Sequence, residues 1–346
     1  MSATERNIHY GVLAASLALA VWVFGAQPHP AEPATHSGAH ARGAAPRSPL
    51  SILPPGSAFV LSVDVHALAR APLGALIAER LGRTAGASKL AQTCGFDPLA
   101  RLDQLALAVP SADLAAQEHA PDFGIVASGR FSAAEIIHCA NTVITQRGGA
   151  SVQSQLGSFE SVRDRTASSG EIAAKDGLVV VSDGNYFRKL LDSAEGNGSA
   201  SPKAASDLEN LREVRDARHA ELRRTLGPAP LLMTWLLSEG WLERVTGTET
   251  DARLSPLSAL KTIGARMEVG KTAELLVLLE CEDSEGATRI SSWLTDLRAS
   301  LGRLPLDPTL VGLASRIAVS PNGASLKLSL DLSEAELGPA LDALGQ

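Results

Sequence analysis

Residues 94–139 of the chain read CGFDPLARLDQLALAVPSADLAAQEHAPDFGIVASGRFSAAEIIHCA. The stretch predicts one strand that ends at Pro110 and a second, largely apolar strand that begins at Phe123. Ser132 and Glu135 then form a capping box, in which each residue satisfies a free amide at the start of a helix. The stretch therefore predicts two strands followed by a well-defined helix, and we read the rest of the chain outward from it.

Strand patterns continue on both sides of this stretch. Residues 57–65 alternate apolar and wetter side chains, which is the period of a strand with one buried face. Residues 151–181 form several short runs separated by turn residues, a pattern typical of an antiparallel meander. Near the end of the chain, Pro321-Asn322-Gly323 predicts the turn of a β-hairpin.

A weaker copy of the opening stretch follows Ser255, and a helix from Ser284 takes the place of the helix from Ser132. We therefore predict an α+β fold of two related units, each a mixed or antiparallel sheet with packed helices. The first unit is expected over residues 53–194, a loop over 195–205 and the second unit over 206–346. The copy rests on matched apolar positions, namely Leu99, Leu102, Leu105, Leu107 and Val109 against Leu257, Leu260, Ile263, Ala265 and Met267.

The run from Tyr10 to Ala26, YGVLAASLALAVWVFGA, contains no charged residue. It is near the short end of the lengths that span a bilayer as a helix. We predict that residues 10–26 form a transmembrane anchor after a tail of residues 1–9. A cleaved signal peptide is disfavoured because the bulky Phe24 occupies a position that should be small, and a buried soluble helix is the remaining alternative. The anchor predicts a single-pass cell-membrane protein whose soluble part is outside the cytoplasm, in the periplasm.

Residues 27–52 are rich in Pro, Ala, Gly and His and lack apolar periodicity. Such a segment buries too little surface to offset its ordering entropy, so we predict a disordered linker. His29, His36 and His40 lack a rigid element and any Cys or carboxylate pattern beside them. We interpret them as solvated linker residues and predict no metal site or other cofactor.

The composition limits the core and the partners. Hydrophobic residues make up 45% of the chain but aromatic residues only 4%, so the core must be built mainly from Leu, Ala, Val and Ile. The formal net charge is −7. Because phosphate binding needs clustered Lys and Arg, this balance argues against a nucleic-acid partner.

The chain has three cysteines, and we predict a disulfide between Cys94 and Cys139 that leaves Cys281 unpaired. Cys94 and Cys139 flank one compact unit, and an exported chain meets conditions in which disulfides persist. Cys281 ends an apolar strand, where a small buried residue is expected. Three reduced thiols are the alternative.

The familiar catalytic and cofactor motifs are absent from the sequence. It contains no H-E-x-x-H, G-x-S-x-G, G-x-G-x-x-G or C-x-x-C. Gly270-Lys271-Thr272 is similar to the end of a phosphate-binding loop, but the upstream glycine is one residue too far away and a strand follows. We therefore interpret this tripeptide as a hairpin turn and predict no catalytic or cofactor-binding residue.

Several stretches resemble a group of N-terminally anchored bacterial envelope proteins of unknown function. These stretches are LPPGSAFVLSVDVHALARAPLG, CGFDPL, DFGIVASGRF and GSFESVRD. The resemblance is strongest over residues 53–194 and implies an anchor followed by repeated strand-helix-strand units. It brings no catalytic residue, because the shared motifs concern packing and turns.

Together these features favour a non-catalytic, membrane-anchored envelope protein that binds a partner protein or a cell-wall component. One alternative is an envelope hydrolase with scattered active-site residues, for which Ser62, Asp64 and His66 are the first candidates. The other is a solute-binding receptor, which requires a cleft between the two units. A pocket that gathers polar side chains would discriminate between these functions.

Overall fold

The structure of the chain is a computed structural model, which describes residues 48–77, 87–110, 123–166, 170–196, 207–242, 252–301 and 308–344. The predicted transmembrane helix over residues 10–26 and the tail before it lie outside these residues. The predicted loop over residues 195–205 also lies outside them, apart from Glu195 and Gly196. Within the described stretches, no helix is both long and apolar enough to cross a membrane.

Strands make up the framework of the described chain, and each is bounded by the turn residues or helices that follow it. In chain order the strands are β1 (Ser57–Asp64), β2 (Leu102–Pro110), β3 (Gly124–Gly129), β4 (Ser151–Leu156), β5 (Phe159–Asp164), β6 (Glu171–Lys175), β7 (Leu178–Ser182), β8 (Leu231–Leu236), β9 (Leu260–Val269), β10 (Ala273–Cys281), β11 (Ala318–Asn322) and β12 (Ser325–Leu332).

Helices connect these strands and cover the sheet. The α-helices are α2 (Pro49–Ile52), α3 (Val65–Arg70), α5 (Ala87–Cys94), α6 (Ala133–Gln146), α7 (Gly184–Glu195), α8 (Asp207–Leu226), α10 (Ser284–Leu301), α11 (Pro308–Arg316) and α12 (Glu334–Leu344), with 3-10 turns at Leu99–Arg101 and Ala252–Ala259.

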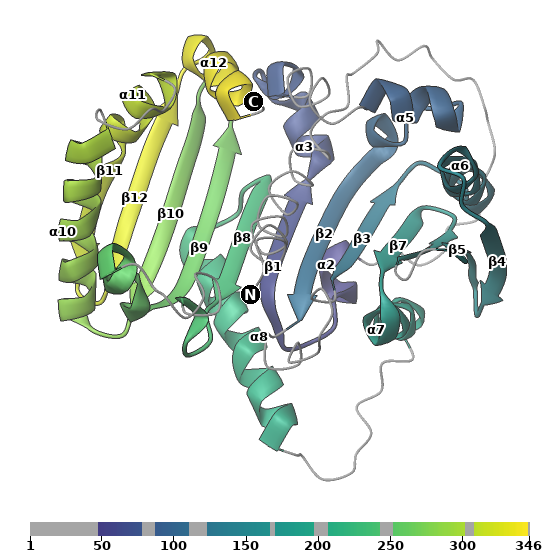
Figure 1. The fold of residues 1–346 in the computed structure, drawn as a ribbon, viewed down its shortest axis with the longest axis horizontal. Helices are drawn as coiled ribbons and strands as arrows, with labels where there is room; N and C mark the ends of the chain where they lie inside the picture. Colours follow the sequence, from purple (N-terminus) through teal and green to yellow (C-terminus); the bar gives the residue numbers. More distant parts are fainter. Residues whose placement is uncertain are drawn as a thin grey trace.

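All twelve strands join one sheet, in the order β11-β12-β10-β9-β8-β1-β2-β3-β7-β6-β5-β4, as Figure 1 shows from left to right. Every neighbouring pair is antiparallel. The chain starts at the centre with β1 and moves outward through β2 and β3, then crosses to β4 at one edge and returns inward through β5, β6 and β7 to pair with β3. It goes back to the centre with β8, moves outward through β9 and β10 and crosses to β11 at the other edge, and β12 then pairs between β11 and β10.

The prediction of two units with sheets of their own, mixed or antiparallel, is wrong. β1 pairs with β8, so that Phe59 lies opposite Trp235 and Val63 opposite Leu231. If the halves were separate, these two apolar strands would be edges with unpaired backbone groups, which proteins avoid. Alternation in a sequence shows which face of a strand is buried, but it does not show which strand lies beside it.

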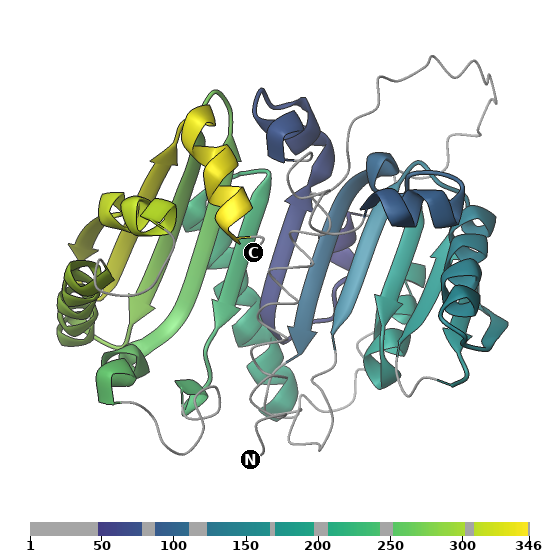
Figure 2. The ribbon, with the colours of Figure 1, turned by 45° about the horizontal axis from the view of Figure 1, so that its top comes forward.

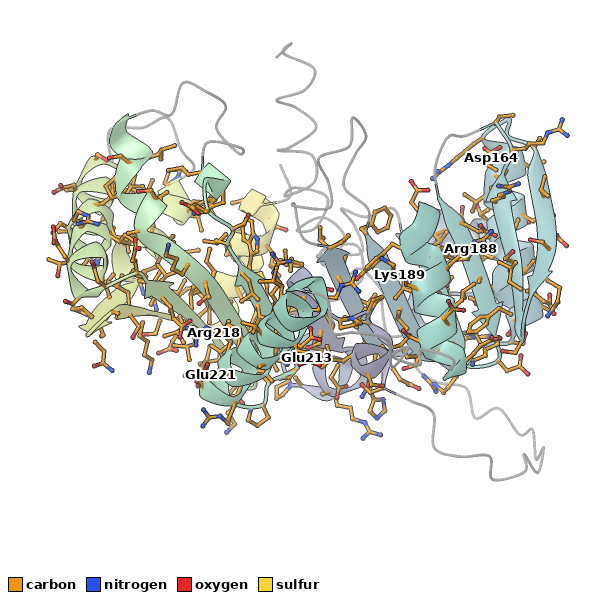
Figure 3. The ribbon with its side chains drawn as sticks, turned by 90° about the horizontal axis from the view of Figure 1, so that it is seen from below. Asp164, Arg188, Lys189, Glu213, Arg218 and Glu221 are labelled. Atoms are coloured by element: carbon orange, nitrogen blue, oxygen red, sulfur yellow. A yellow bond between two sulfur atoms is a disulfide. The ribbon has the colours of Figure 1, made fainter. Side chains whose placement is uncertain are left out.

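The helices divide between the two faces of the sheet (Figures 1 and 2). One face, called here the α6 face, carries α3, α6, α10 and α12, and its central core includes Leu61, Val63 and Leu337. The other, called here the α8 face, carries α2, α7 and α8. Its core includes Val126, Val180 and the side chains of α7. Figure 3 shows α8 crossing the middle of the molecule on this face, with α7 to its right.

Three local predictions from the sequence are confirmed, namely the capping box of α6, the antiparallel meander and the C-terminal hairpin. The capping box is present: the Ser132 hydroxyl accepts from the Glu135 amide at 3.2 Å, and the Ser132 amide donates to the Glu135 carboxylate at 2.9 Å. The meander over β4 to β7 and the hairpin of β11 with β12 are also confirmed.

The end of the predicted linker is ordered. Residues 49–52 form α2, and Ile52 is fully buried against α7 and the central strands. Pro49 occupies the first turn of α2, where a missing amide hydrogen costs nothing. The folded part therefore begins a few residues earlier than composition suggested, because a single buried isoleucine fixes the chain to the α8 face.

Candidate functional site

The predicted disulfide is confirmed: Cys94 and Cys139 are bonded, with their Cα atoms 4.4 Å apart. Cys94 is the last residue of α5, and Cys139 lies on the buried side of α6. The bond fixes α5 to α6, and the Thr93 hydroxyl adds a hydrogen bond to the Gln146 side chain at 3.2 Å. Both cysteines are almost completely buried, so the bond is part of the fold.

Cys281 is unpaired and buried beneath α10, next to Ala287 and Ile290. Burial raises the pKa of its thiol above the ordinary value, and the nearby carboxylate of Asp283 adds to this effect. The thiol therefore stays protonated and is a poor nucleophile. Its role in the described structure is to fill the core.

The three residues suggested for a hydrolase do not form a catalytic arrangement. Ser62 and Asp64 project from the same side of β1, but the Asp64 carboxylate caps α3 by accepting from the Ala67 amide at 2.8 Å. His66 is exposed on α3. Within the described chain, none of the three lines the hollow beside α7 or the hollow at the β9–β10 turn, so the geometry does not favour this site.

The seam between the halves is a hydrogen-bonded ladder reinforced by α8, in place of the cleft that a solute receptor would need. His219 of α8 is buried, with Nδ1 2.7 Å from the Thr234 hydroxyl of β8 and Nε2 2.9 Å from the Ser57 carbonyl of β1. Arg218 extends further and donates to Glu280 of β10 at 2.7 Å. A single helix thus joins strands from both halves.

Burial lowers the pKa of His219 below its ordinary value, although its hydrogen bond to Ser57 acts in the opposite direction. The charges that face it along α8 are Arg223, Arg215 and Asp216. The imidazole is therefore neutral at neutral pH. It uses one nitrogen as donor and the other as acceptor, so it serves as a structural bridge across the seam.

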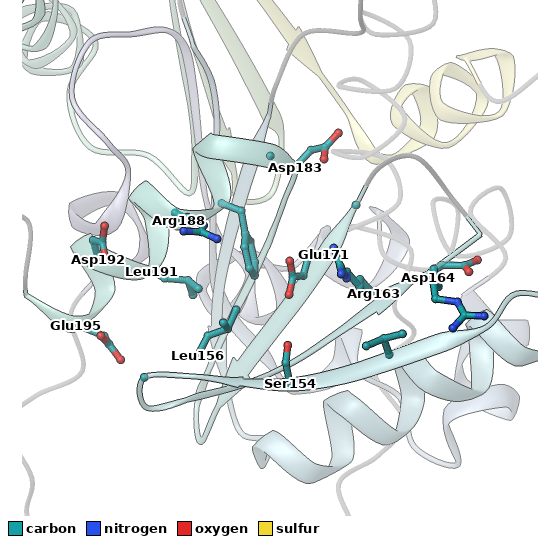
Figure 4. Close-up of a pocket in the computed structure, with 16 residues that line it drawn as sticks. Ser154, Leu156, Arg163, Asp164, Glu171, Asp183, Arg188, Leu191, Asp192 and Glu195 are labelled. Atoms are coloured by element: carbon teal, nitrogen blue, oxygen red, sulfur yellow. The ribbon is translucent and has the colours of Figure 1, made fainter.

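A large hollow in the described structure lies on the α8 face, between α7 and the strands β4 to β6. It is open to solvent and has a volume of about 1150 Å³ (Figure 4). The β4–β5 hairpin forms one wall and α7 forms the other. Its lining contains basic, acidic and apolar groups: Arg163, Arg165 and Arg188; Asp164, Glu171, Asp183, Asp192 and Glu195; Val152, Leu156, Phe187 and Leu191.

The tip of the β4–β5 hairpin is fixed to the end of α7. Gly157 has a φ of +59° in the tight turn, and a Cβ at this position would lie 2.1 Å from the Glu195 carboxylate. That carboxylate accepts from the Ser158 amide at 2.7 Å, and this hydrogen bond lowers the pKa of Glu195. Glu195 therefore stays ionised and holds the two walls at a fixed separation at this end.

Two arginines and a glutamate lie together in the hollow. Arg163 of β5 is directly opposite Glu171 of β6 in the sheet register, and Arg188 comes from the exposed side of α7. Figure 4 shows Glu171 between Arg163 and Arg188. Within the described part of the chain, none of these three side chains has a hydrogen-bonded or ionic partner. They are therefore available to a ligand.

The Ser154 hydroxyl lines the hollow, and two further serine hydroxyls lie on the neighbouring strands β5 and β7. The Ser154 and Ser161 hydroxyls are 2.7 Å apart, and Ser161 is fully buried. Ser182 is also fully buried, and its hydroxyl donates to the Phe123 carbonyl at 2.6 Å. These hydroxyls bond to each other and to the backbone, and no histidine or cysteine is among the residues that line the hollow. The arrangement is suited to recognition by hydrogen bonds and charge.

Few features of the sequence indicate this hollow. The strand pattern places Arg163 and Glu171 on neighbouring strands of the meander. Whether the two residues lie opposite each other depends on the length of the turn between these strands, which the pattern does not specify. Arg188 is exposed on a short helix whose position could not be inferred. Charged residues on strand positions that alternate with buried residues were the only available signal.

The Gly270-Lys271-Thr272 tripeptide is a hairpin turn between β9 and β10, as predicted, with the Gly270 amide donating to the Thr272 carbonyl at 2.9 Å. A small hollow of about 240 Å³ surrounds it. Lys271 and the acids Glu268 and Glu274 line this hollow beside Pro230. It is much smaller than the hollow beside α7 and lies on the turn itself, so the hollow beside α7 is the stronger candidate.

Comparisons with known proteins leave the family open. No protein-family model matches the chain, and no curated protein matches it. Among solved structures, crystal form III of TP0453 aligns with a TM-score of 0.46 and 11% identity, covering 86% of this chain and 98% of that one. Crystal form I of TP0453 aligns with a TM-score of 0.43 at the same identity and coverage. Similarity at this level carries no argument about function.

Proposed function

We propose that the chain is a non-catalytic envelope protein, anchored in the membrane through residues 10–26, whose folded part binds a partner protein in the hollow beside α7. The observation that carries the proposal is the pair of arginines, Arg163 and Arg188, that project into an open hollow without a partner in the described structure. The buried disulfide supports a location outside the cytoplasm, since such bonds persist in oxidising compartments.

The size and lining of the hollow favour a protein segment over a small molecule. Its volume of about 1150 Å³ is above the usual range for small-molecule sites, and it is open along its length. Small-molecule sites are mostly apolar, whereas this lining mixes both signs of charge with a few apolar side chains. A partner segment with charged side chains of both signs complements such a surface.

The arginines are the expected centre of recognition. A guanidinium group binds carboxylates with two parallel hydrogen bonds, and arginine is enriched among the residues that dominate interface energies. Glu171 lines the same hollow opposite Arg163 and provides an acceptor for a basic group on the same partner. The site therefore selects a segment in which acidic side chains flank a basic one.

The proposal is tested by purifying the full-length protein from its membrane, identifying the protein that copurifies with it, and measuring the affinity of that protein for each variant. Charge reversal by Arg163→Glu or Arg188→Glu removes a charge-assisted hydrogen bond worth about 1.5 to 3 kcal/mol and adds repulsion. Binding is expected to weaken roughly ten- to hundredfold. Lys189→Glu is the matched control, because Lys189 is exposed on the same helix but does not line the hollow.

Binding of the same partner to all of these variants with equal affinity would contradict the proposal. Loss of binding in Lys189→Glu as well as Arg188→Glu would show that net charge, and not the hollow, controls the interaction. Retention of a cell-wall saccharide in place of a protein would assign the hollow to the other class of ligand expected from the sequence.

A further inference from the structure

The edge strand β4 of the sheet has features that natural edge strands usually avoid. Its sequence, SVQSQL, has no charged residue and no proline, and it pairs with β5 without a register shift. Gln153, Ser154 and Gln155 are exposed. Natural proteins protect edges with charges, proline, bulges or a covering element, because an unprotected edge pairs with another strand.

The opposite edge of the sheet is protected. β11 contains Pro321, which has no amide hydrogen to offer a neighbouring strand. Its Val319 packs into the core beneath α10, so a helix lies against this edge. The contrast between the two edges of one sheet indicates that β4 is kept open for a partner strand.

The direction of the backbone groups on β4 follows from its hairpin. Leu156 and Phe159 flank the two-residue turn and form the hydrogen-bonded pair that closes it. In an antiparallel ladder such pairs alternate, so the amide and carbonyl groups of Ser151, Gln153 and Gln155 point away from β5. No described strand pairs with this side of β4. An extended backbone is the partner that matches such an array.

We propose that the partner strand is β4 of a second copy of this chain, paired antiparallel about a two-fold axis at Gln153. In this register Gln153 lies opposite Gln153 of the second copy. Likewise, Ser151 lies opposite the second copy's Gln155, and Val152 opposite its Ser154. No like charges meet, because the strand has none. A closed, two-fold contact of this kind is the commonest way in which identical chains associate, and a self-complementary uncharged strand needs no other partner.

The pairing joins the sheets of the two copies into one continuous sheet and places both hollows on the same face of it. A two-fold axis perpendicular to the sheet keeps the α8 face of both copies on one side. Val152 and Ser154 line the hollow from β4, so these residues of the two copies would alternate across the junction. If the proposed function holds, the recognition surface becomes continuous over both copies and suits a two-fold or extended partner.

Cross-linking of the full-length chain in its membrane tests the pairing. In a hydrogen-bonded pair on the axis the two Cα atoms are about 5.5 Å apart, within the range of a disulfide. Gln153→Cys is therefore expected to give a covalent dimer on mild oxidation. Ser320→Cys on β11 and Glu160→Cys on β5, which are equally exposed, are expected to stay monomeric. Equal cross-linking at all three positions would overturn the proposal.

Proline substitution tests the same contact without a cross-link. The Gln153 amide points away from β5. Gln153→Pro therefore removes a backbone hydrogen bond between the two copies but no hydrogen bond between β4 and β5. The dissociation constant of the dimer in detergent is expected to rise at least tenfold, and Gln153→Thr, which keeps the amide, should behave as wild type. Unchanged thermal unfolding of Gln153→Pro would show that the fold is intact.

The outcomes separate this inference from the proposed function. Arg163→Glu and Arg188→Glu should lose the partner protein and remain dimeric, whereas Gln153→Pro should lose the dimer. A wild-type chain that is monomeric at every concentration would refute the pairing. A cross-link from Gln153→Cys to a different envelope protein would also refute it, and would assign the edge to that protein.

Discussion

Opening the Cys94–Cys139 disulfide is expected to destabilise the folded part by a predictable amount. Replacing both cysteines by serine releases a loop with a sequence separation of 45 residues. In the chain-entropy model, closing a loop of this length contributes about 4 kcal/mol by restricting the unfolded chain. Both side chains are less than one-tenth exposed, so the new serine hydroxyls add a further cost.

The assay is urea unfolding of the purified protein with and without a thiol reductant. Reductant is expected to lower the free energy of unfolding of the wild type by about 4 kcal/mol. The double variant should be less stable from the outset and should not respond to reductant. Cys281→Ala is the matched control, because it removes the remaining cysteine and should keep the full response.

A wild-type protein whose stability is the same with and without reductant would refute this reasoning. It would show that Cys94 and Cys139 are not bonded in the purified chain. The absence of the bond would also remove the main structural support for the proposed oxidising compartment.

Further predictions concern the capping box, the seam and the α7 contact. Ser132→Ala removes the cap of α6 and should cost about 1 kcal/mol in thermal unfolding. Burial lowers the pKa of folded His219 below its ordinary value of 6.5. Below that pH the unfolded chain therefore binds more protons, and the unfolding free energy should fall as the pH falls; this dependence should be weaker in His219→Gln. Gly124→Ala places a Cβ 2.6 Å from the Leu190 and Tyr186 side chains and should cost about 1 to 3 kcal/mol in urea unfolding.

The local structure of the chain could be predicted because it depends on neighbouring residues. The capping box at Ser132, the meander and the hairpin turns use residue types whose geometry is set within a few positions. The disulfide was predictable because Cys94 and Cys139 flank one unit and the third cysteine ends an apolar strand. Each of these inferences required only short-range information.

The joining of the halves could not be predicted, because strand pairing is not encoded locally. β1 and β8 are far apart in the sequence, and the apolar pattern of each shows that it is buried without showing which strand lies beside it. The bridge from His219 to Thr234 and Ser57 is a long-range contact made by a helix that reads as charged and solvent-exposed. A buried histidine on such a helix becomes evident only when the sheet beneath it is known.

The hollow beside α7 was also beyond the sequence, since it depends on how separate elements are placed. Arg163 and Arg188 line one hollow because the β4–β5 hairpin lies opposite α7, and Glu195 fixes the hairpin to the end of that helix. The serine-rich strands that line the hollow resemble ordinary solvent-exposed strands. Ser62, Asp64 and His66, by contrast, are near one another in sequence, but Asp64 caps α3 and His66 is exposed outside the hollow.

Site-specific photo-crosslinking in living cells tests the central claim most directly. A photoreactive amino acid in place of Asp192 would lie in the hollow. The same photoreactive amino acid in place of Lys189 would lie on the same helix but outside the hollow. The account predicts a cross-link from position 192 to an envelope protein, little from position 189, and loss of the cross-link when Arg163→Glu and Arg188→Glu are added. Equal cross-linking from both positions, unaffected by the charge reversals, would contradict it.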